Sequence, residues 1–263
     1  MANPRLEVKN VARKAKLGNP RSIGRLLSYI SGERVWDAFD RTTYDHVRND
    51  VLNFGIFLPN GAPAQYRDLQ HLCNAINKVE TRKNARTGRE FLGSLPNEIS
   101  ASEQWRIVCD YIHRLFTDQG LVAVAAHHAG VNEADHSKDN PHAHIIVSTR
   151  TLGPDGFSLR KDRLHNQRSF VELWRKEWAV EHNRAYERCR LAVRVSDERL
   201  LPLGVDLEPL NYLSRIDYQR ELRGKRTVAG DLRRAVQSRN EERIRQCELQ
   251  LERENELEFE LLI

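Results

Sequence analysis

Two histidines separated by one residue, His142 and His144, are the most informative feature of this sequence. They lie in the run Pro141–Val147, whose apolar residues are typical of a buried strand. Side chains alternate between the two faces of a strand, so His142 and His144 project from one face and could coordinate the same metal ion.

A third metal ligand is expected from the run just upstream, Val122–His128, which also has the pattern of a short buried strand. Its even positions place the bulkier side chains on one face with His128, whereas its odd positions give His127 only alanines. We therefore favour His128 as the third ligand, with His127 as the alternative on this strand and His136 in the connecting segment as a weaker one. Three neutral imidazoles leave open positions on a divalent ion, which suits a catalytic site better than a closed structural one.

The composition of the 263 residues, with 40% hydrophobic and 30% charged side chains, predicts one domain of about 200 residues followed by a tail. No apolar run approaches the roughly 18 residues of a membrane helix, and the N-terminus lacks the apolar region of a signal peptide. Four widely scattered cysteines are typical of free thiols in a reducing cytoplasm. We therefore expect a soluble protein without membrane insertion.

The net charge of +5 is modest, but basic residues crowd the N-terminal segment and recur around Arg86. Basic clusters together with a metal site indicate phosphate chemistry on a nucleic acid. The residues predicted to contact the nucleic acid are Lys9, Arg13, Lys14, Lys16, Arg21 and Arg86.

The elements that must position these residues follow from periodicity and turn signals. Strands are expected at 6–11, 52–58, 90–95, 122–128 and 141–147, and helices at 21–30, 64–79, 100–115, 170–186 and beyond 231. Because the central hairpin is antiparallel, we expect an α+β fold with a mainly antiparallel central sheet flanked by helices. Residues 1–200 would form the main domain and 201–263 a helical C-terminal extension.

An ordered series of segments extends over roughly residues 5–240. Its members are Ser28–Glu33, Leu58–Pro63, Arg89–Pro96, Gly120–His128, Asn140–His144, Ser148–Arg150, Trp174–Asn183, Gly204–Pro209 and Arg223–Asp231. In this order the segments resemble the MobA/MobL family of conjugative relaxases, which belong to the HUH endonucleases. The resemblance implies a relaxase-like palm, with residues 1–200 as its catalytic domain.

The resemblance also implies a reaction, in which a tyrosine attacks one phosphodiester at the nic site of an origin of transfer. The products are a 5′-phosphotyrosyl bond and a free 3′-hydroxyl. Tyr29 matches the position of this nucleophile, with Tyr44 and Tyr66 less favoured. A phenol is a weak nucleophile near neutral pH, so a divalent cation, most simply Mn²⁺ or Mg²⁺, would polarise the phosphate oxygens from the three histidines.

Glu90 matches an acidic residue that these enzymes place near the active centre, where it would act as a base or orient a histidine. Leu92 stands where many relatives have a second acid, which leaves the identity of the base open. The partners implied are single-stranded origin DNA, accessory relaxosome proteins and a type IV secretion coupling protein. The implied location is the bacterial cytoplasm, with transfer alongside the DNA strand.

Two other functions are compatible with parts of this pattern. A rolling-circle replication initiator or an HUH transposase would share the histidine and tyrosine chemistry, but in those families the tyrosine characteristically follows the histidine motif. Tyr29 precedes it. A protein of another class would bind DNA without catalysis and use the histidines to hold a structural metal.

Overall fold

A computed structural model describes residues 4–13, 22–134, 136, 139–167, 169–195, 208 and 213–260. The chain divides into two compact units, Met1–Asp197 and Glu198–Ile263. The assignment of residues 1–200 as a catalytic domain and 201–263 as an extension stays a prediction about function.

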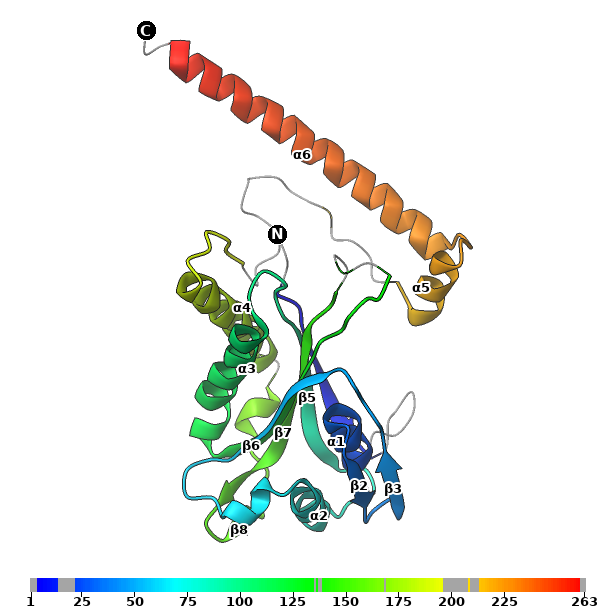
Figure 1. The fold of residues 1–263 in the computed structure, drawn as a ribbon, viewed down its shortest axis with the longest axis vertical. Helices are drawn as coiled ribbons and strands as arrows, with labels where there is room; N and C mark the ends of the chain where they lie inside the picture. Colours follow the sequence, from blue (N-terminus) through cyan, green and yellow to red (C-terminus); the bar gives the residue numbers. More distant parts are fainter. Residues whose placement is uncertain are drawn as a thin grey trace. The chain divides into compact units, whose positions relative to one another are not determined.

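The first unit is built on an antiparallel sheet with the strand order β1-β5-β7-β6-β4, and β8 adds to the end of β7 (Figure 1). The strands are β1 (Leu6–Ala12), β4 (Val51–Phe57), β5 (Arg86–Ser94), β6 (Leu121–His128), β7 (His142–Gly153) and β8 (Gly156–Phe157). Each of these pairings is antiparallel, which confirms the predicted sheet. A separate hairpin contains β2 (Arg34–Asp37) and β3 (Thr42–Asp45).

Helices cover both faces of the sheet, as the α+β prediction requires (Figure 1). The α1/α2 face lies under α1 (Ile23–Ser31) and α2 (Leu69–Val79), and the α3/α4 face lies under α3 (Ala101–Leu115) and α4 (Ser169–Arg188). Along β6, Val122 and Val124 pack on the α1/α2 face. The intervening Ala123 and Ala125 pack on the α3/α4 face. This alternation decides which histidine of β6 meets which helices.

The core of the α3/α4 face is largely aromatic. Trp178 of α4 meets Tyr111 of α3 edge to face, with ring centroids 5.0 Å apart, and Trp174 meets Phe91 of β5 in the same way. These four side chains are almost fully buried. Large buried rings supply much of the apolar area that stabilises a domain, so this face carries a large share of the stability.

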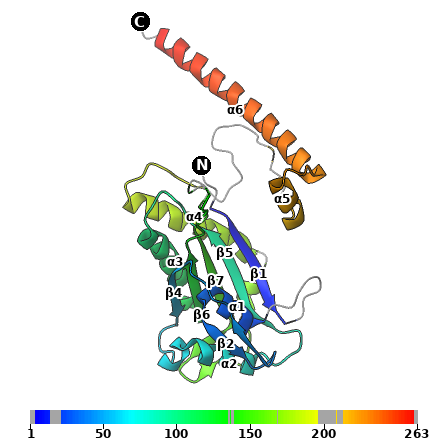
Figure 2. The same ribbon diagram turned by 45° about the vertical axis from the view of Figure 1, so that its right-hand side comes forward.

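The position of α1 is fixed by polar contacts at its N-terminus. The Ser22 side chain accepts a hydrogen bond from the Arg25 N–H and caps the helix. The buried Asp37 carboxylate at the end of β2 accepts hydrogen bonds from the Ser22 hydroxyl (2.5 Å) and the Gly24 N–H (2.9 Å). Figure 2 shows the resulting placement of β2 beside α1.

Some element boundaries differ from the sequence prediction. β5 begins at Arg86 rather than at residue 90, because its polar first half pairs with β1. The predicted helix over 64–79 begins with a 3₁₀ turn, Ala64–Arg67, and α2 starts only after the Asp68 side chain accepts a hydrogen bond from the His71 N–H. The β2–β3 hairpin was not predicted. Its strands are only four residues long, too short for a clear alternation.

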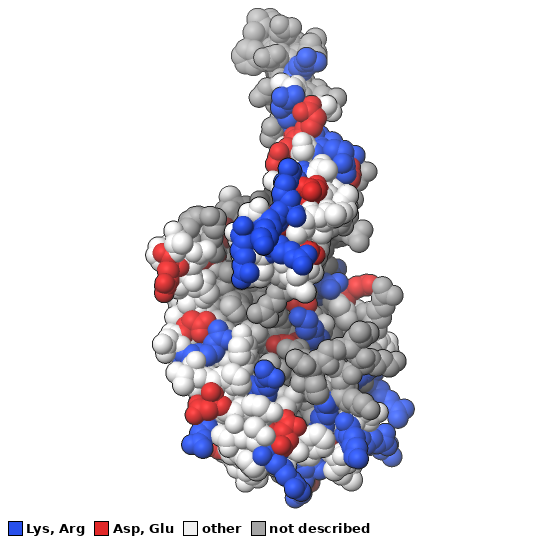
Figure 3. Space-filling view, turned by 90° about the vertical axis from the view of Figure 1, so that its right-hand side faces the viewer, with Lys and Arg blue, Asp and Glu red and all other residues white. Residues whose placement is uncertain are grey.

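The second unit contains α5 (Arg215–Leu222) and α6 (Val228–Glu260), which confirms a helical C-terminal region. Arg234 of α6 pairs with Glu221 of α5, and Glu221 also accepts a hydrogen bond from the Thr227 N–H. Basic and acidic side chains lie next to one another along α6 (Figure 3). Within the described residues, no helix is both long and apolar enough to cross a membrane.

Replacing Gly93 with alanine is expected to lower the free energy of unfolding by about 1–3 kcal/mol, the usual cost of overpacking a core. A Cβ atom at Gly93 of β5 would lie 2.5 Å from Cζ2 of Trp178, closer than real Cβ atoms come. Chemical denaturation followed by tryptophan fluorescence measures this cost. Gly153→Ala is the matched control, because a Cβ there meets no described atom within 4 Å. Equal stability of the two variants would contradict the predicted clash.

Candidate active site

The three predicted ligands His128, His142 and His144 lie together on the α1/α2 face. His128 of β6 is directly opposite His142 of β7, and His144 is opposite Ala126, two pairs further along and therefore on the same face. One ring nitrogen from each histidine lies within 4.8 Å of the others. The strand phase that favoured His128 therefore brings three imidazoles to one point.

Each imidazole of this cluster is oriented by an acceptor on one of its two nitrogens. The pairs are His128 Nε2 with the Ile30 carbonyl (2.9 Å), His142 Nδ1 with the Asn140 carbonyl (2.8 Å) and His144 Nδ1 with Glu90 Oε1 (3.2 Å). Carbonyl and carboxylate oxygens only accept, so the histidine nitrogen donates in each pair. The other nitrogen of each ring is thereby left with a lone pair suited to a metal ion.

The cluster fits a divalent cation. His128 Nδ1 is buried and has no hydrogen-bond partner among the described residues, which is costly unless a ligand occupies it. Burial lowers the pKa of His128 to about 4 and also lowers the pKa of His142. Both rings are therefore neutral at pH 7, the form that binds metals.

The two alternative ligands lie elsewhere. His127 is buried on the opposite face of the sheet, where its Nδ1 lies 3.3 Å from Asn53 Oδ1. His136 is exposed and pairs with Asp139 at 3.4 Å. Neither residue belongs to the three-histidine cluster among the described residues.

Tyr29 lies on the last turn of α1 and meets this cluster directly. Its ring packs edge to face on His144, with centroids 5.7 Å apart, and 40% of the residue is exposed. Because the adjacent Ile30 carbonyl accepts the His128 hydrogen bond, the backbone that carries Tyr29 is fixed to the histidines. A phenol that is both anchored and accessible is suited to attack on an external phosphate.

The other two tyrosines considered as nucleophiles are engaged differently. The Tyr44 hydroxyl donates a hydrogen bond to Asp40 Oδ2 at 2.8 Å. Tyr66 is buried, with its ring against Phe157 of β8. Of the three, only Tyr29 has a ring contact with a histidine of the cluster.

A basic residue that the sequence analysis missed lies beside Tyr29. The Arg48 guanidinium carbon is 4.6 Å from the centroid of the Tyr29 ring, within the range of a cation–π contact. Arg48 also forms a bidentate pair with Asp50 (2.8 and 2.6 Å) and holds the pKa of Asp50 to about 2. The Asp50 carbonyl accepts a hydrogen bond from the Ala129 N–H, which ties this segment to the residue after His128.

Glu90 occupies the position expected of a residue that orients a histidine. It is buried on β5, and Oε1 faces His144 Nδ1. Leu92, at the position where relatives have a second acid, is the strand partner of His144. The geometry thus couples Glu90 to one ligand, while the identity of a general base stays open.

The predicted DNA contacts have different environments. Lys9 is exposed on β1 and pairs with Glu7 at 2.8 Å, and Arg86 is exposed at the start of β5. Arg13 is buried, with its guanidinium bonded to the Glu80 carbonyl and to Asn77 Oδ1, so we leave it out of the DNA-binding surface. Lys14, Lys16 and Arg21 lie outside the described residues.

Comparison with known proteins agrees with this geometry. Residues 21–215 match the MobA/MobL family. The chain belongs to the MobA/MobL family. It is similar to the probable mobilization protein MobA of Bifidobacterium longum (strain NCC 2705), with 35% identity over 167 residues, 62% of this chain and 28% of that protein. It is also similar to the mobilization protein MobL of Acidithiobacillus ferridurans, with 27% identity over 241 residues, 81% of this chain and 62% of that protein.

The chain therefore spans less than two thirds of either MobA/MobL relative. Among solved structures, it is similar to a chain described under "Molecular Basis of Vancomycin Resistance Transfer in Staphylococcus aureus", with a TM-score of 0.66 and 25% identity. That match covers 75% of this chain and 100% of the other. A metal-bound conjugative relaxase TrwC in complex with OriT DNA shares the fold, with a TM-score of 0.50 and 15% identity over 90% of this chain and 98% of the other.

Removing one histidine of the cluster is expected to abolish tight Mn²⁺ binding. His128→Ala should lower the affinity by more than about 100-fold, since loss of an outer partner alone costs about 10- to 100-fold. Isothermal titration calorimetry with Mn²⁺ at pH 7 measures the affinity. His127→Ala is the matched control, because this buried histidine faces the other side of the sheet. An unchanged affinity in His128→Ala, or a larger loss in His127→Ala, would contradict the assignment.

Glu90→Gln tests the orienting role of Glu90. The amide keeps the size of the side chain but removes the charge that holds His144, so Mn²⁺ affinity should fall by about 10- to 100-fold. The same titration measures the effect, and circular dichroism checks the fold. Wild-type affinity in this variant would show that Glu90 does not position the histidine.

Proposed function

We propose that this chain is a conjugative relaxase, which nicks one DNA strand at the nic site of a plasmid origin of transfer. The observation that carries the proposal is the edge-to-face contact of Tyr29 with His144 of a three-histidine cluster in a MobA/MobL-family fold. This arrangement sets an accessible phenol beside three imidazoles that could hold a metal ion. A tyrosine transesterification needs both.

In the proposed reaction the phenolic oxygen of Tyr29 attacks the phosphorus of one phosphodiester. A bond forms between this oxygen and phosphorus, the bond from phosphorus to the 3′ oxygen breaks, and the phenolic proton is passed to the departing oxygen. The products are a 5′-phosphotyrosyl ester and a 3′-hydroxyl. The ester conserves the bond energy, so the strand can be rejoined without ATP.

The residues around Tyr29 would prepare this step. A divalent ion held by His128, His142 and His144, Mn²⁺ or Mg²⁺, would supply positive charge to the phosphate oxygens. Glu90 would keep His144 in one orientation. The Arg48 guanidinium packs on the Tyr29 ring, limits its rotation and lies close enough to attract an incoming phosphate.

The proposal includes the partners and location that such a reaction requires. The substrate would be single-stranded origin DNA, presented with accessory relaxosome proteins. After nicking, a type IV secretion coupling protein would receive the covalent complex, so the chain would act in the bacterial cytoplasm and leave with the transferred strand. The TrwC structure that shares this fold is a complex with OriT DNA.

Tyr29→Phe is expected to abolish the covalent adduct with origin DNA, because only the hydroxyl can form the ester. The ring and its contacts with His144 and Arg48 are kept, so the variant should still bind DNA and Mn²⁺. A labelled oligonucleotide carrying the origin, separated on a denaturing gel, measures the adduct. Tyr44→Phe is the matched control and should react like the wild type.

An adduct formed by Tyr29→Phe would show that the nucleophile is another residue. If the wild type forms no adduct on any origin-containing strand in the presence of Mn²⁺ or Mg²⁺, the relaxase proposal fails. A protein that binds DNA and metal without catalysis would then be the better account.

A further inference from the structure

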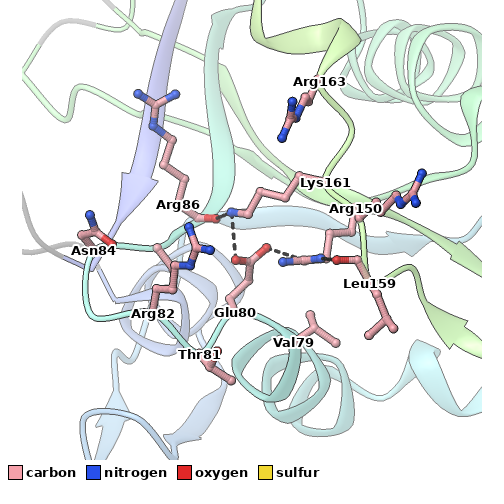
Figure 4. A pocket seen from close by; sticks show the side chains of 12 residues that line it. Val79, Glu80, Thr81, Arg82, Asn84, Arg86, Arg150, Leu159, Lys161 and Arg163 are labelled. Carbon is pink, nitrogen blue, oxygen red and sulfur yellow. Dashed lines mark hydrogen bonds and ion pairs between the residues drawn. The ribbon is translucent and has the colours of Figure 1, made fainter.

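A basic pocket lies at the end of β5 and β7 opposite to the histidine cluster (Figure 4). Its volume is about 910 Å³. The basic side chains that line it are Arg82, Arg86, Arg150, Arg160, Lys161 and Arg163. Glu80, which follows α2, is the only acidic residue among the described lining residues. This strong excess of positive charge has no role in the proposed reaction.

Two of these six basic side chains, Arg150 and Lys161, form ion pairs with Glu80. Its buried carboxylate accepts hydrogen bonds from Arg150 Nε and from Lys161 Nζ, each at 2.8 Å, as the dashed lines in Figure 4 show. A buried carboxylate held by two cations is a rigid base for a binding site, because each side chain is fixed by a charged partner. The floor of the pocket is therefore preorganised.

The other four cations are unmatched. Arg82, Arg86, Arg160 and Arg163 are exposed, and no described carboxylate pairs with any of them. On the face shown in Figure 3, acidic side chains lie among the basic ones. Arginines gathered around a hollow without counter-charges attract a polyanion, and their planar guanidinium groups match phosphate oxygens.

The sheet fixes the distance from this pocket to the proposed nic site. Arg150 lies on β7 six residues beyond His144, and Arg86 begins β5, whose residues 89–94 pair with residues 142–147 of β7. At about 3.3 Å per residue, Arg150 is about 20 Å along the strand from His144. A strand stacked as in duplex DNA, with about 3.4 Å of helix axis per nucleotide, would cover this distance with about six nucleotides, and an extended single strand would need fewer.

The lining residues also indicate which part of DNA the pocket would hold. No aromatic side chain is among the described lining residues, and its apolar members are Val79, Ala85 and Leu159. A site that reads bases in a single strand normally offers rings for stacking. We propose that the basic pocket binds backbone phosphates of the DNA strand at most about six nucleotides from the phosphate that Tyr29 attacks. The site is independent of base identity, and its relation to Tyr29 rests on the proposed function.

Binding of oligodeoxythymidine tests the pocket without knowledge of the origin. Fluorescence anisotropy would compare chains of about three and about twenty nucleotides across a range of salt concentrations, because only the longer chain can span both sites. In the wild type the longer chain should bind more tightly and with a steeper salt dependence. Arg82→Glu and Arg163→Glu should each remove much of this gain and lower the slope of log K against log salt by about 0.7 for each lost phosphate contact.

Lys176→Glu is the matched control, because Lys176 is exposed on α4 and the change in charge is the same. Circular dichroism checks that each variant folds, and Arg82→Gln and Arg163→Gln replace any variant that does not. The pocket variants should still form the covalent adduct on an origin oligonucleotide too short to reach the pocket.

Three results would overturn the inference. These are an equal affinity of the wild type for short and long oligodeoxythymidine, an equal loss in Lys176→Glu, or wild-type binding of the long chain by both pocket variants. A site for small free anions would be indicated if pyrophosphate bound the pocket and long oligodeoxythymidine did not displace it. Absence of a covalent adduct in the wild type would instead reject the relaxase proposal, and the length and salt data would still decide whether the pocket binds DNA.

Discussion

The hydrogen bond from His128 Nε2 to the Ile30 carbonyl joins the two parts on which the candidate site depends. Ile30 lies in the last turn of α1, where helix carbonyls lack a partner within the helix. His128 satisfies one of these carbonyls and in doing so turns its other nitrogen toward His142 and His144. The same bond fixes the end of α1, and therefore Tyr29, at a constant height above the sheet. Loss of this bond would loosen the nucleophile and a ligand together.

The two faces of the sheet have different roles, since one carries the aromatic core and the other carries the candidate site. On the α3/α4 face, Trp174, Trp178 and Tyr111 form a dense aromatic core that contributes packing. On the α1/α2 face, polar side chains interrupt the apolar core at the end of β6 and the start of β7, where one nitrogen of each histidine is paired with Glu90 or with a backbone carbonyl. Buried polar groups are tolerated when they are paired in this way, so stability and chemistry compete little for the same residues.

The sequence predicted the parts of the candidate site that depend on the periodic spacing of side chains in one strand or one helix. The alternation in β6 separates His127 from His128 without knowledge of the tertiary structure, and the apolar spacing of 23–30 predicts the helix that carries Tyr29. Tyr29 itself was singled out by the family resemblance, since its own spacing fits an ordinary amphipathic helix. Arg48 was missed because it lies in an irregular segment after β3, where no period relates it to α1.

The net charge of the chain follows from its sequence, but the positions of the basic side chains in the fold do not. The sequence around Arg13 predicts an exposed basic segment. Arg13 is buried instead, because its guanidinium donates hydrogen bonds to Asn77 Oδ1 and to the Glu80 carbonyl at the end of α2. The basic pocket is assembled from the α2–β5 connection, the far part of β7 and the segment after β8. The first of these lies about seventy residues before the other two. The pairing of β5 with β7 and the ion pairs of Glu80 with Arg150 and Lys161 bring them together.

The position of His128 on one face of the sheet also constrains the length of β6. A one-residue insertion within β6 would move every side chain beyond it to the opposite face of the sheet. His127 would then point toward α1, and His128 would point away from it. The Asn140 N–H donates to the Gly130 carbonyl and closes the hairpin at its base. A change in the length of residues 131–139 would therefore leave the pairing of β6 with β7 in place, whereas an insertion within either strand would turn its side chains to the other face.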